Sequence, residues 1–303
     1  MFKIKKTAAD KEHFITLHNA DHSVYAEVSL HEGARLKTLV FSGVPVIQEE
    51  GTIAYEDSYA SSLLFPFANR IAGGKYNFKG VNYQFYCNEN GGKNALHGLV
   101  YDKPFELVSH AVSESRVVVT LGYQAAEPSK GFPFCYDFSV SYTLTATTLA
   151  VEVFLSNIDT KEFPFTLGWH PYFYTSDLER SFLHFESSHK IKFDADLITD
   201  TLIPCEEMMP FIVADKQLDA SFVLKTNTVV FTTPEYKLEL KTNTQENYLQ
   251  LYTPENRKEI AIEPMTGISD SFNNGRGLQI LKSGERYTVK WTLDFTNNKT
   301  DNE

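Results

Sequence analysis

Two side chains that can exchange protons stand out in this sequence of 303 residues. His170 lies within an aromatic-rich stretch, residues 165–173, directly before a proline. An unperturbed imidazole has a pKa of about 6.5, so it can accept or donate a proton near neutral pH. Glu263 follows the apolar residues 260–262 and also precedes a proline, so each group is expected at a strand end. The two could form an acid/base pair. A histidine packed in an aromatic core and a surface carboxylate are the alternative, and the pattern alone leaves both open.

Three further polar residues could bind a ligand. Asn69 and Arg70 follow an apolar run, and the fixed N–H donors of a guanidinium suit the oxygens of a polyol. His97 directly precedes Gly98, and a glycine allows the backbone to approach another group closely. A structural ion pair for Arg70 and a turn histidine without a chemical role are the corresponding alternatives.

Other kinds of active site find no support. The HExxH, GxxxxGK[ST], GxSxG and GxGxxG motifs are all missing, which argues against zinc hydrolysis, phosphate cradles and a nucleophile elbow. Cys87, Cys135 and Cys205 are isolated and form neither a disulfide framework nor a metal-binding pattern. We therefore expect no metal site and a reducing, cytoplasmic setting. The first residues lack the apolar run of about 7–15 residues that a signal peptide requires.

The charge balance narrows the range of partners. The chain has 39 acidic and 28 basic side chains and a formal net charge of −11. Nucleic acids, anionic membrane surfaces and polyanionic substrates are disfavoured, because binding them requires clustered Lys and Arg. A neutral small molecule fits best, since the field of the protein would not repel it.

Strands with alternating apolar residues must position these groups. Over residues 137–157, Phe138, Val140, Tyr142 and Leu144 alternate with polar residues, and the alternation resumes after a short turn, which predicts a β-hairpin. Further strands are expected at 181–185, 190–193, 228–232, 237–241, 248–252, 259–262 and 287–295. Convincing amphipathic helices are almost missing, apart from a short helical turn expected near residues 204–214. We predict one large antiparallel β domain over residues 1–303 with very little helix, ending in a polar tail at about 296–303.

Five segments, taken in order, resemble one known family. They are NRIAGGKYNFKG at residues 69–80, LHG at 96–98, GFP at 131–133, WHPYF at 169–173, and IEPMTG at 262–267 with FN at 272–273. In this order and over about residues 28–295 they resemble the aldose 1-epimerase (mutarotase) family. LVYDK at 99–103 and the WHPYF context depart from the best-known galactose mutarotases, and the WHPYF context resembles the shorter bacterial branch of the family. The resemblance implies the all-β supersandwich of galactose mutarotase-like proteins.

The resemblance also implies roles for individual residues. His170 takes the position of the general acid and Glu263 that of the general base. Arg70, His97 and the adjacent Asn69 take the positions of substrate ligands. Asp219, in LDASF at 218–222, resembles the hydroxyl-binding aspartate of the family.

The implied activity is the interconversion of the α and β anomers of an aldose by ring opening and reclosure. It requires no cofactor, and the expected partner is a monosaccharide bound by a monomer or a homodimer. A non-catalytic sugar-binding module and a hexose-6-phosphate 1-epimerase are the alternatives. The mechanism requires His170 and Glu263 to face one cleft, separated by about the width of a sugar ring, with Arg70 and His97 beside them.

Overall fold

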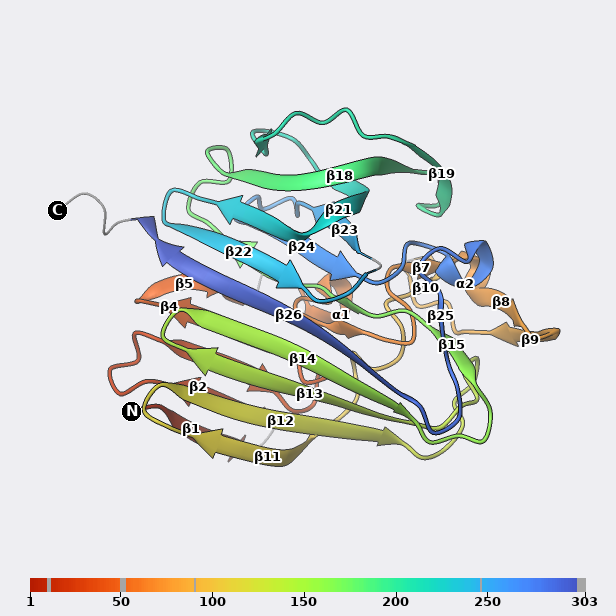
Figure 1. Cartoon of the computed structure of the whole chain (residues 1–303), viewed down its shortest axis with the longest axis horizontal. Coiled ribbons are helices and arrows are strands. Elements are labelled where there is room, and N and C mark those ends of the chain that lie inside the picture. The colour runs from red at the N-terminus through yellow and green to blue at the C-terminus, as the bar shows by residue number, and fades with distance from the viewer. Residues whose placement is uncertain (10–11, 50–52, 90, 246, 299–303) are drawn as a thin grey trace.

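The protein is built almost entirely from antiparallel strands, as its computed structural model shows (Figure 1). The structure describes residues 1–9, 12–49, 53–89, 91–245 and 247–298. The largest sheet follows the strand order β11-β12-β13-β14-β26-β22-β21-β23-β24-β16-β6, with β17 paired to β24 and β18–β20 attached at β21. The expected all-β architecture is thereby confirmed.

The strands of the large sheet come from the whole length of the chain. In sequence order they are β6 (Leu63–Leu64), β11 (Glu106–Val112), β12 (Arg116–Ala125), β13 (Tyr136–Thr145), β14 (Thr148–Asn157), β16 (Gly168–Trp169), β17 (Tyr172–Tyr174), β18 (Phe182–Phe193), β19 (Thr199–Pro204), β20 (Phe211–Ile212), β21 (Asp219–Thr232), β22 (Tyr236–Thr242), β23 (Tyr248–Tyr252), β24 (Glu259–Met265) and β26 (Arg286–Asn297).

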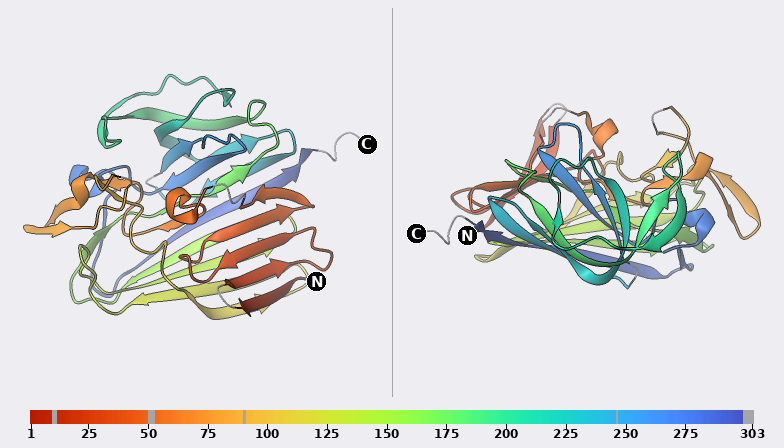
Figure 2. Two further views of the ribbon diagram at one scale, coloured as in Figure 1. Left: turned by 180° about the vertical axis from the view of Figure 1, so that it is seen from behind. Right: turned by 90° about the horizontal axis from the view of Figure 1, so that it is seen from above.

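A second layer covers one face of this sheet. It is a five-stranded sheet in chain order, which lies over the β11–β14 half of the large sheet in both views of Figure 2. Its strands are β1 (Lys3–Ala9), β2 (Glu12–His18), β3 (Tyr25–Ser29), β4 (Leu36–Phe41) and β5 (Val44–Ile47). The two layers meet through apolar contacts such as Phe41 on Phe295, whose ring centroids lie 5.2 Å apart.

Short ribbons and helical turns complete the fold. The ribbons pair β7 (Arg70–Ile71) with β10 (Ala95–Leu96), β8 (Lys75–Phe78) with β9 (Val81–Gln84), and β15 (Phe163–Phe165) with β25 (Gln279–Leu281). The helical turns are α1 (Tyr55–Ser58), a 3-10 turn at Ala72–Gly74, and α2 (Ser271–Asn274). Among the described residues, no helix has the length and apolar character needed to cross a membrane.

Period-two alternation explains the register of the predicted hairpin. Phe138 lies opposite Leu155 and Leu144 opposite Leu149, so the apolar residues of β13 and β14 share one face. Those four side chains are fully buried, while the residues between them are largely half-buried or exposed. The hairpin prediction is therefore confirmed. This register is well defined, because a shift of one residue would turn the apolar set out of the core.

Some local predictions are wrong. Residues 204–214 do not form a helical turn: Pro204 ends β19, and β20 pairs with β18. Phe211 is buried against Phe185 and Phe222, a contact that the extended segment provides. The strands expected at 181–185 and 190–193 are a single strand, β18, interrupted by register shifts.

The polar tail also begins later than predicted. β26 continues through residues 296 and 297, because both are paired with β22. The last five tail residues, 299–303, lie outside the described part of the chain.

Candidate active site

A pocket of about 230 Å³ brings together all six predicted site residues. These are Asn69, Arg70, His97, His170, Asp219 and Glu263, and the pocket is also lined by Ile53, Asp57, Ser58, Tyr59, Leu96, Tyr172, Gln250 and Tyr252. The six predicted residues come from five separate segments of the chain, which the fold brings together around one pocket.

His170 lies where β16 ends and before β17 begins. The following Pro171 cannot donate to a ladder, so regular pairing stops there, as predicted. The backbone is nevertheless fixed, since the N–H of His170 donates to Ser62 O at 3.0 Å. His170 is only 5% exposed, and its imidazole stacks on Tyr172, with ring centroids 5.1 Å apart. Its Nδ1 atom has no hydrogen-bond partner among the described residues.

Glu263 lies within a strand rather than at its end, which corrects the prediction. β24 continues through Pro264 to Met265. The strand tolerates this proline because of the edge on which the missing N–H would lie. The N–H groups of Ile262 and Thr266, two residues before and two residues after the proline, donate to carbonyls within residues 167–171. The ladder on that side is already interrupted where β16 gives way to β17, so the missing N–H leaves no broken pair.

The two groups are in direct contact. His170 Nε2 and Glu263 Oε1 are 3.4 Å apart, and Glu263 is 2% exposed. They face one pocket, as expected, but they are closer than the predicted width of a sugar ring. The second carboxylate oxygen, Oε2, has no hydrogen-bond partner within the described ranges.

Burial controls the protonation of this pair. Desolvation lowers the pKa of His170 to about 4. Desolvation also raises the pKa of Glu263 well above its ordinary value; the charge of Asp219 adds to this shift and that of Arg70 opposes it. Burial therefore favours the neutral form of both groups, in which the proton of the pair lies on the Glu263 carboxyl. The acid and base roles expected from the sequence require a Glu263 carboxylate and a His170 imidazolium. Transfer of one proton from Glu263 to His170, within their contact, gives that arrangement.

The ribbon of β7 and β10 positions three of the predicted ligands. Leu96 lies opposite Arg70, and the N–H of His97 donates to Asn69 O at 2.9 Å. Asn69 and His97 both adopt left-handed backbone angles, with φ of 60° and 59°. Such non-glycine residues are uncommon and concentrate at functional sites.

Gly98 confirms the predicted close approach. Its φ is 79°, and a Cβ atom at this position would lie 2.2 Å from Phe65 O. The next N–H, that of Leu99, donates to the same oxygen at 2.6 Å. The glycine therefore lets the chain after His97 pack directly on the backbone of the neighbouring segment.

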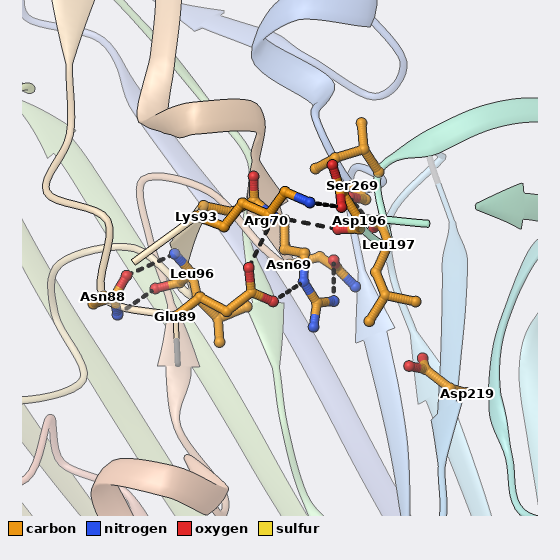
Figure 3. A network of polar contacts seen from close by, with 12 residues as sticks. Asn69, Arg70, Asn88, Glu89, Lys93, Leu96, Asp196, Leu197, Asp219 and Ser269 are labelled. Atoms are coloured by element: carbon orange, nitrogen blue, oxygen red, sulfur yellow. Dashed lines mark hydrogen bonds and ion pairs between the residues drawn. The ribbon is translucent and has the colours of Figure 1, made fainter. Parts of the chain in front are cut away.

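Arg70 both lines the pocket and forms an ion pair. Its Nε lies 2.6 Å from Glu89 Oε1, and the two side chains are 16% and 18% exposed (Figure 3). Its carbonyl oxygen accepts a hydrogen bond from the N–H of Asp270 at 2.7 Å. The structural ion pair and the ligand role, which the sequence presents as alternatives, are thus compatible.

Asp219 and Gln250 line the pocket as a hydrogen-bonded pair. Asp219 begins β21, and Gln250 Nε2 donates to its Oδ1 at 2.6 Å. The surrounding wall desolvates this carboxylate and raises its pKa, while Arg70 and the Gln250 hydrogen bond oppose the shift. Gln250 is 3% exposed, its Oε1 has no partner in the described chain, and it lies directly opposite Glu263.

Gln250 is a site residue that the sequence analysis missed. It lies in the predicted strand 248–252, but its position beside Glu263 follows only from the pairing of β23 with β24. The sequence analysis also assigned no site role to Tyr59, Tyr172 and Tyr252, which line the same pocket. Nowhere in the described ranges do three or more His, Cys, Asp or Glu residues form a group that could hold a metal ion.

Comparisons with known proteins agree with the all-β fold. The model of the family Aldose 1-epimerase matches residues 13–294. The uncharacterized protein YihR of Escherichia coli (strain K12) is 29% identical over 277 residues, covering 86% of this chain and 87% of YihR. A galactose mutarotase-like protein from Clostridium acetobutylicum shares the fold with a TM-score of 0.87 and 17% identity, covering 98% of this chain and 99% of that one. Galactose 1-epimerase from Lactobacillus acidophilus gives a TM-score of 0.79 and 17% identity, covering 98% and 99%.

Proposed function

The chain belongs to the aldose 1-epimerase family, and we propose that it interconverts the α and β anomers of an unphosphorylated aldose. The observation that carries the proposal is the buried contact of His170 with Glu263 at 3.4 Å, on the wall of a polar pocket. Burying two titratable groups side by side is unfavourable for stability. An acid/base reaction gives a reason for keeping them there.

The chemistry of anomer exchange fits adjacent proton donors and acceptors. The C1 hydroxyl must lose its proton while the ring oxygen gains one, and both oxygens are bonded to C1. One acid and one base can serve both atoms in a single pose only if they lie close together. The short separation of His170 and Glu263 therefore suits the reaction better than the ring-width spacing expected from the sequence.

The proposed cycle starts from the pair with its single proton. Transfer of that proton within the contact gives a Glu263 carboxylate and a His170 imidazolium. The carboxylate accepts the proton of the C1 hydroxyl, the imidazolium protonates the ring oxygen, and the bond between C1 and the ring oxygen breaks. Rotation about C1–C2 exposes the other face of the aldehyde, and reclosure reverses both transfers. Each proton transfer supplies a rate factor of ~10²–10⁴.

The remaining wall supports binding of a polyol. Arg70 has N–H donors beyond the one that faces Glu89, and Asp219 offers acceptor oxygens. We propose that these two residues, together with Asn69 and His97, bind the sugar hydroxyls. Burial lowers the pKa of His97 well below its ordinary value, so it would act as a neutral hydrogen-bonding group.

The charges of the pocket favour a neutral sugar. Asp57, Asp219 and Glu263 line it, while Arg70 is the one Lys or Arg among the lining residues that the structure describes. That cation is already paired with Glu89. A phosphorylated sugar would meet an excess of carboxyl groups, which disfavours the hexose-6-phosphate alternative.

Polarimetry tests the proposal directly. Freshly dissolved α-glucose, α-galactose and α-glucose 6-phosphate are each followed with and without the protein. We expect faster decay of the optical rotation for at least one free aldose and little acceleration for the phosphate. Saturable sugar binding without any acceleration would favour a non-catalytic binding module, and preferred acceleration of the phosphate would favour the 6-phosphate epimerase.

A further inference from the structure

We propose that Glu89 is a positioning residue, which holds the Arg70 guanidinium in the orientation that binds the sugar. This inference rests on the proposed function, because it assigns Glu89 a part in substrate binding through Arg70. Glu89 is not one of the residues that line the pocket. Its contribution must therefore pass through the side chain that it contacts.

The geometry of the ion pair leaves the far end of the guanidinium available. Glu89 Oε1 contacts Nε of Arg70 at 2.6 Å, on the side of the guanidinium nearest the main chain. Within the described part of the chain, the terminal nitrogens make one weak contact, from Nη1 to Asn69 Oδ1 at 3.4 Å. A guanidinium has five N–H donors in a fixed plane, so fixing Nε also fixes the direction of the others.

Glu89 is itself held on its second oxygen. Asn94 Nδ2 donates to Glu89 Oε2 at 2.8 Å, and Asn94 is 3% exposed. The amide oxygen of Asn94 accepts the N–H of Gly73 at 3.1 Å. One carboxylate oxygen is thus used for Arg70 and the other for a buried anchor, which restricts the rotation of the Glu89 side chain.

The residue before Glu89 ties the same segment to the site ribbon. Asn88 accepts the N–H of Leu96 at 2.8 Å and donates to its carbonyl at 3.0 Å, as Figure 3 shows. Leu96 is the strand partner of Arg70. The carboxylate and the guanidinium are therefore carried by one hydrogen-bonded unit.

Two other carboxyl groups could compete with Glu89 for the Arg70 guanidinium, which explains why a fixed ion pair is useful. Asp219 and Glu263 also line the pocket, and the charge of Arg70 acts on both. A guanidinium without a partner would be drawn toward these acids. There it would occupy the space of the sugar and pair with groups that the reaction needs. Glu89 prevents this by offering a closer, fixed partner outside the pocket.

A double-mutant cycle tests the proposal. The rate of anomer exchange is measured for the wild type, Glu89→Ala, Arg70→Ala and the double variant. Loss of a charged hydrogen bond at Arg70 predicts that Glu89→Ala lowers kcat/KM by about 10- to 100-fold, mainly through KM. In the Arg70→Ala background the same substitution should have almost no effect. Glu207→Ala removes a carboxylate paired with Lys190 at 2.7 Å and is the matched control, expected to leave kcat/KM unchanged.

Equal losses in both backgrounds would overturn the positioning role, because a loop-stabilising role would not depend on Arg70. Inactivity of the wild type on every aldose would instead contradict the proposed function. In that case the positioning role can still be tested by NMR, without catalysis. The Arg70 Nε–H resonance is identified by its loss in Arg70→Lys. It should be protected from solvent exchange in the wild type and lose this protection in Glu89→Gln. An unprotected resonance in the wild type would also overturn the proposal.

Discussion

Replacing Glu263 with glutamine should make the protein more stable as well as inactive, and the gain should grow with pH. Glu263 is 2% exposed, and its Oε2 has no partner among the described residues. Burial raises its pKa well above the ordinary value, so the folded chain retains a proton that the unfolded chain releases. Stability then falls as pH rises, from about pH 4.3 up to the folded pKa, by about 1.4 kcal/mol per pH unit. Glutamine has the same shape and no titrating proton, so this loss disappears.

His170 acts in the opposite direction over a lower range. Its pKa falls to about 4 on folding. The unfolded chain therefore binds the extra proton up to about pH 6.5, and stability rises with pH across that interval. The two slopes offset each other below about pH 6.5. Both proteins contain His170, so its contribution cancels from the difference between their stabilities, which reports on Glu263.

The assay is thermal unfolding followed by tryptophan fluorescence at pH values from 5 to 8. Trp169 and Trp291 are both buried and report on the core. With an unfolding entropy of about 2.1 cal/mol/K per residue, 1.4 kcal/mol corresponds to about 2 °C in Tm. The Tm of Glu263→Gln should exceed that of the wild type by a gap that widens by about 2 °C per pH unit until the pH reaches the folded pKa of Glu263. Glu239→Gln removes a half-exposed carboxylate of β22 as a control for charge loss. A gap that stays constant from pH 5 to 8 would refute the raised pKa.

Three further predictions concern the backbone and the titration of the site. Gly98→Ala should lower the unfolding free energy by about 2 kcal/mol or more, since its Cβ would lie 2.2 Å from Phe65 O. Gly80→Ala, with a similar φ but open space around it, is the matched control, and equal losses of Tm in the two variants would contradict the argument. Asp219→Asn should lower the pKa of Glu263 by removing a nearby negative charge, which moves the corresponding inflection of the kcat/KM profile to lower pH; an unchanged or raised inflection would count against it. In the wild type, kcat/KM should fall on the acid side near pH 4, where the pair binds a second proton. An acid limb near pH 6.5 would indicate a solvated histidine.

Sequence patterns predict much of this fold because alternation determines which side of a strand is buried. The β13–β14 hairpin follows from its apolar residues alone. The helical turn expected near residues 204–214 fails because Phe211 packs against distant aromatics, and these tertiary contacts outweigh local preference.

The candidate site was likewise predictable from the sequence only in part. The six residues named from motifs line one pocket, since each motif marks an irregular backbone segment or a strand position beside it. The contact of His170 with Glu263, the place of Gln250 and the clamp on Arg70 by Glu89 could not be predicted. They depend on which strands pair and on where the fold places residues 88, 89 and 94, and neither is encoded in local spacing.

Magnetization exchange between the anomeric protons of a sugar tests the central claim most directly. Two-dimensional NMR exchange spectra of an equilibrated aldose show cross-peaks between its α and β anomeric protons only when the two interconvert within the mixing time. With catalytic amounts of wild-type protein we predict such cross-peaks for at least one free aldose. Folded His170→Asn and Glu263→Gln variants should each lower the exchange rate by a factor of ~10²–10⁴. Exchange that persists in either variant within a few-fold of the wild-type rate would contradict the account.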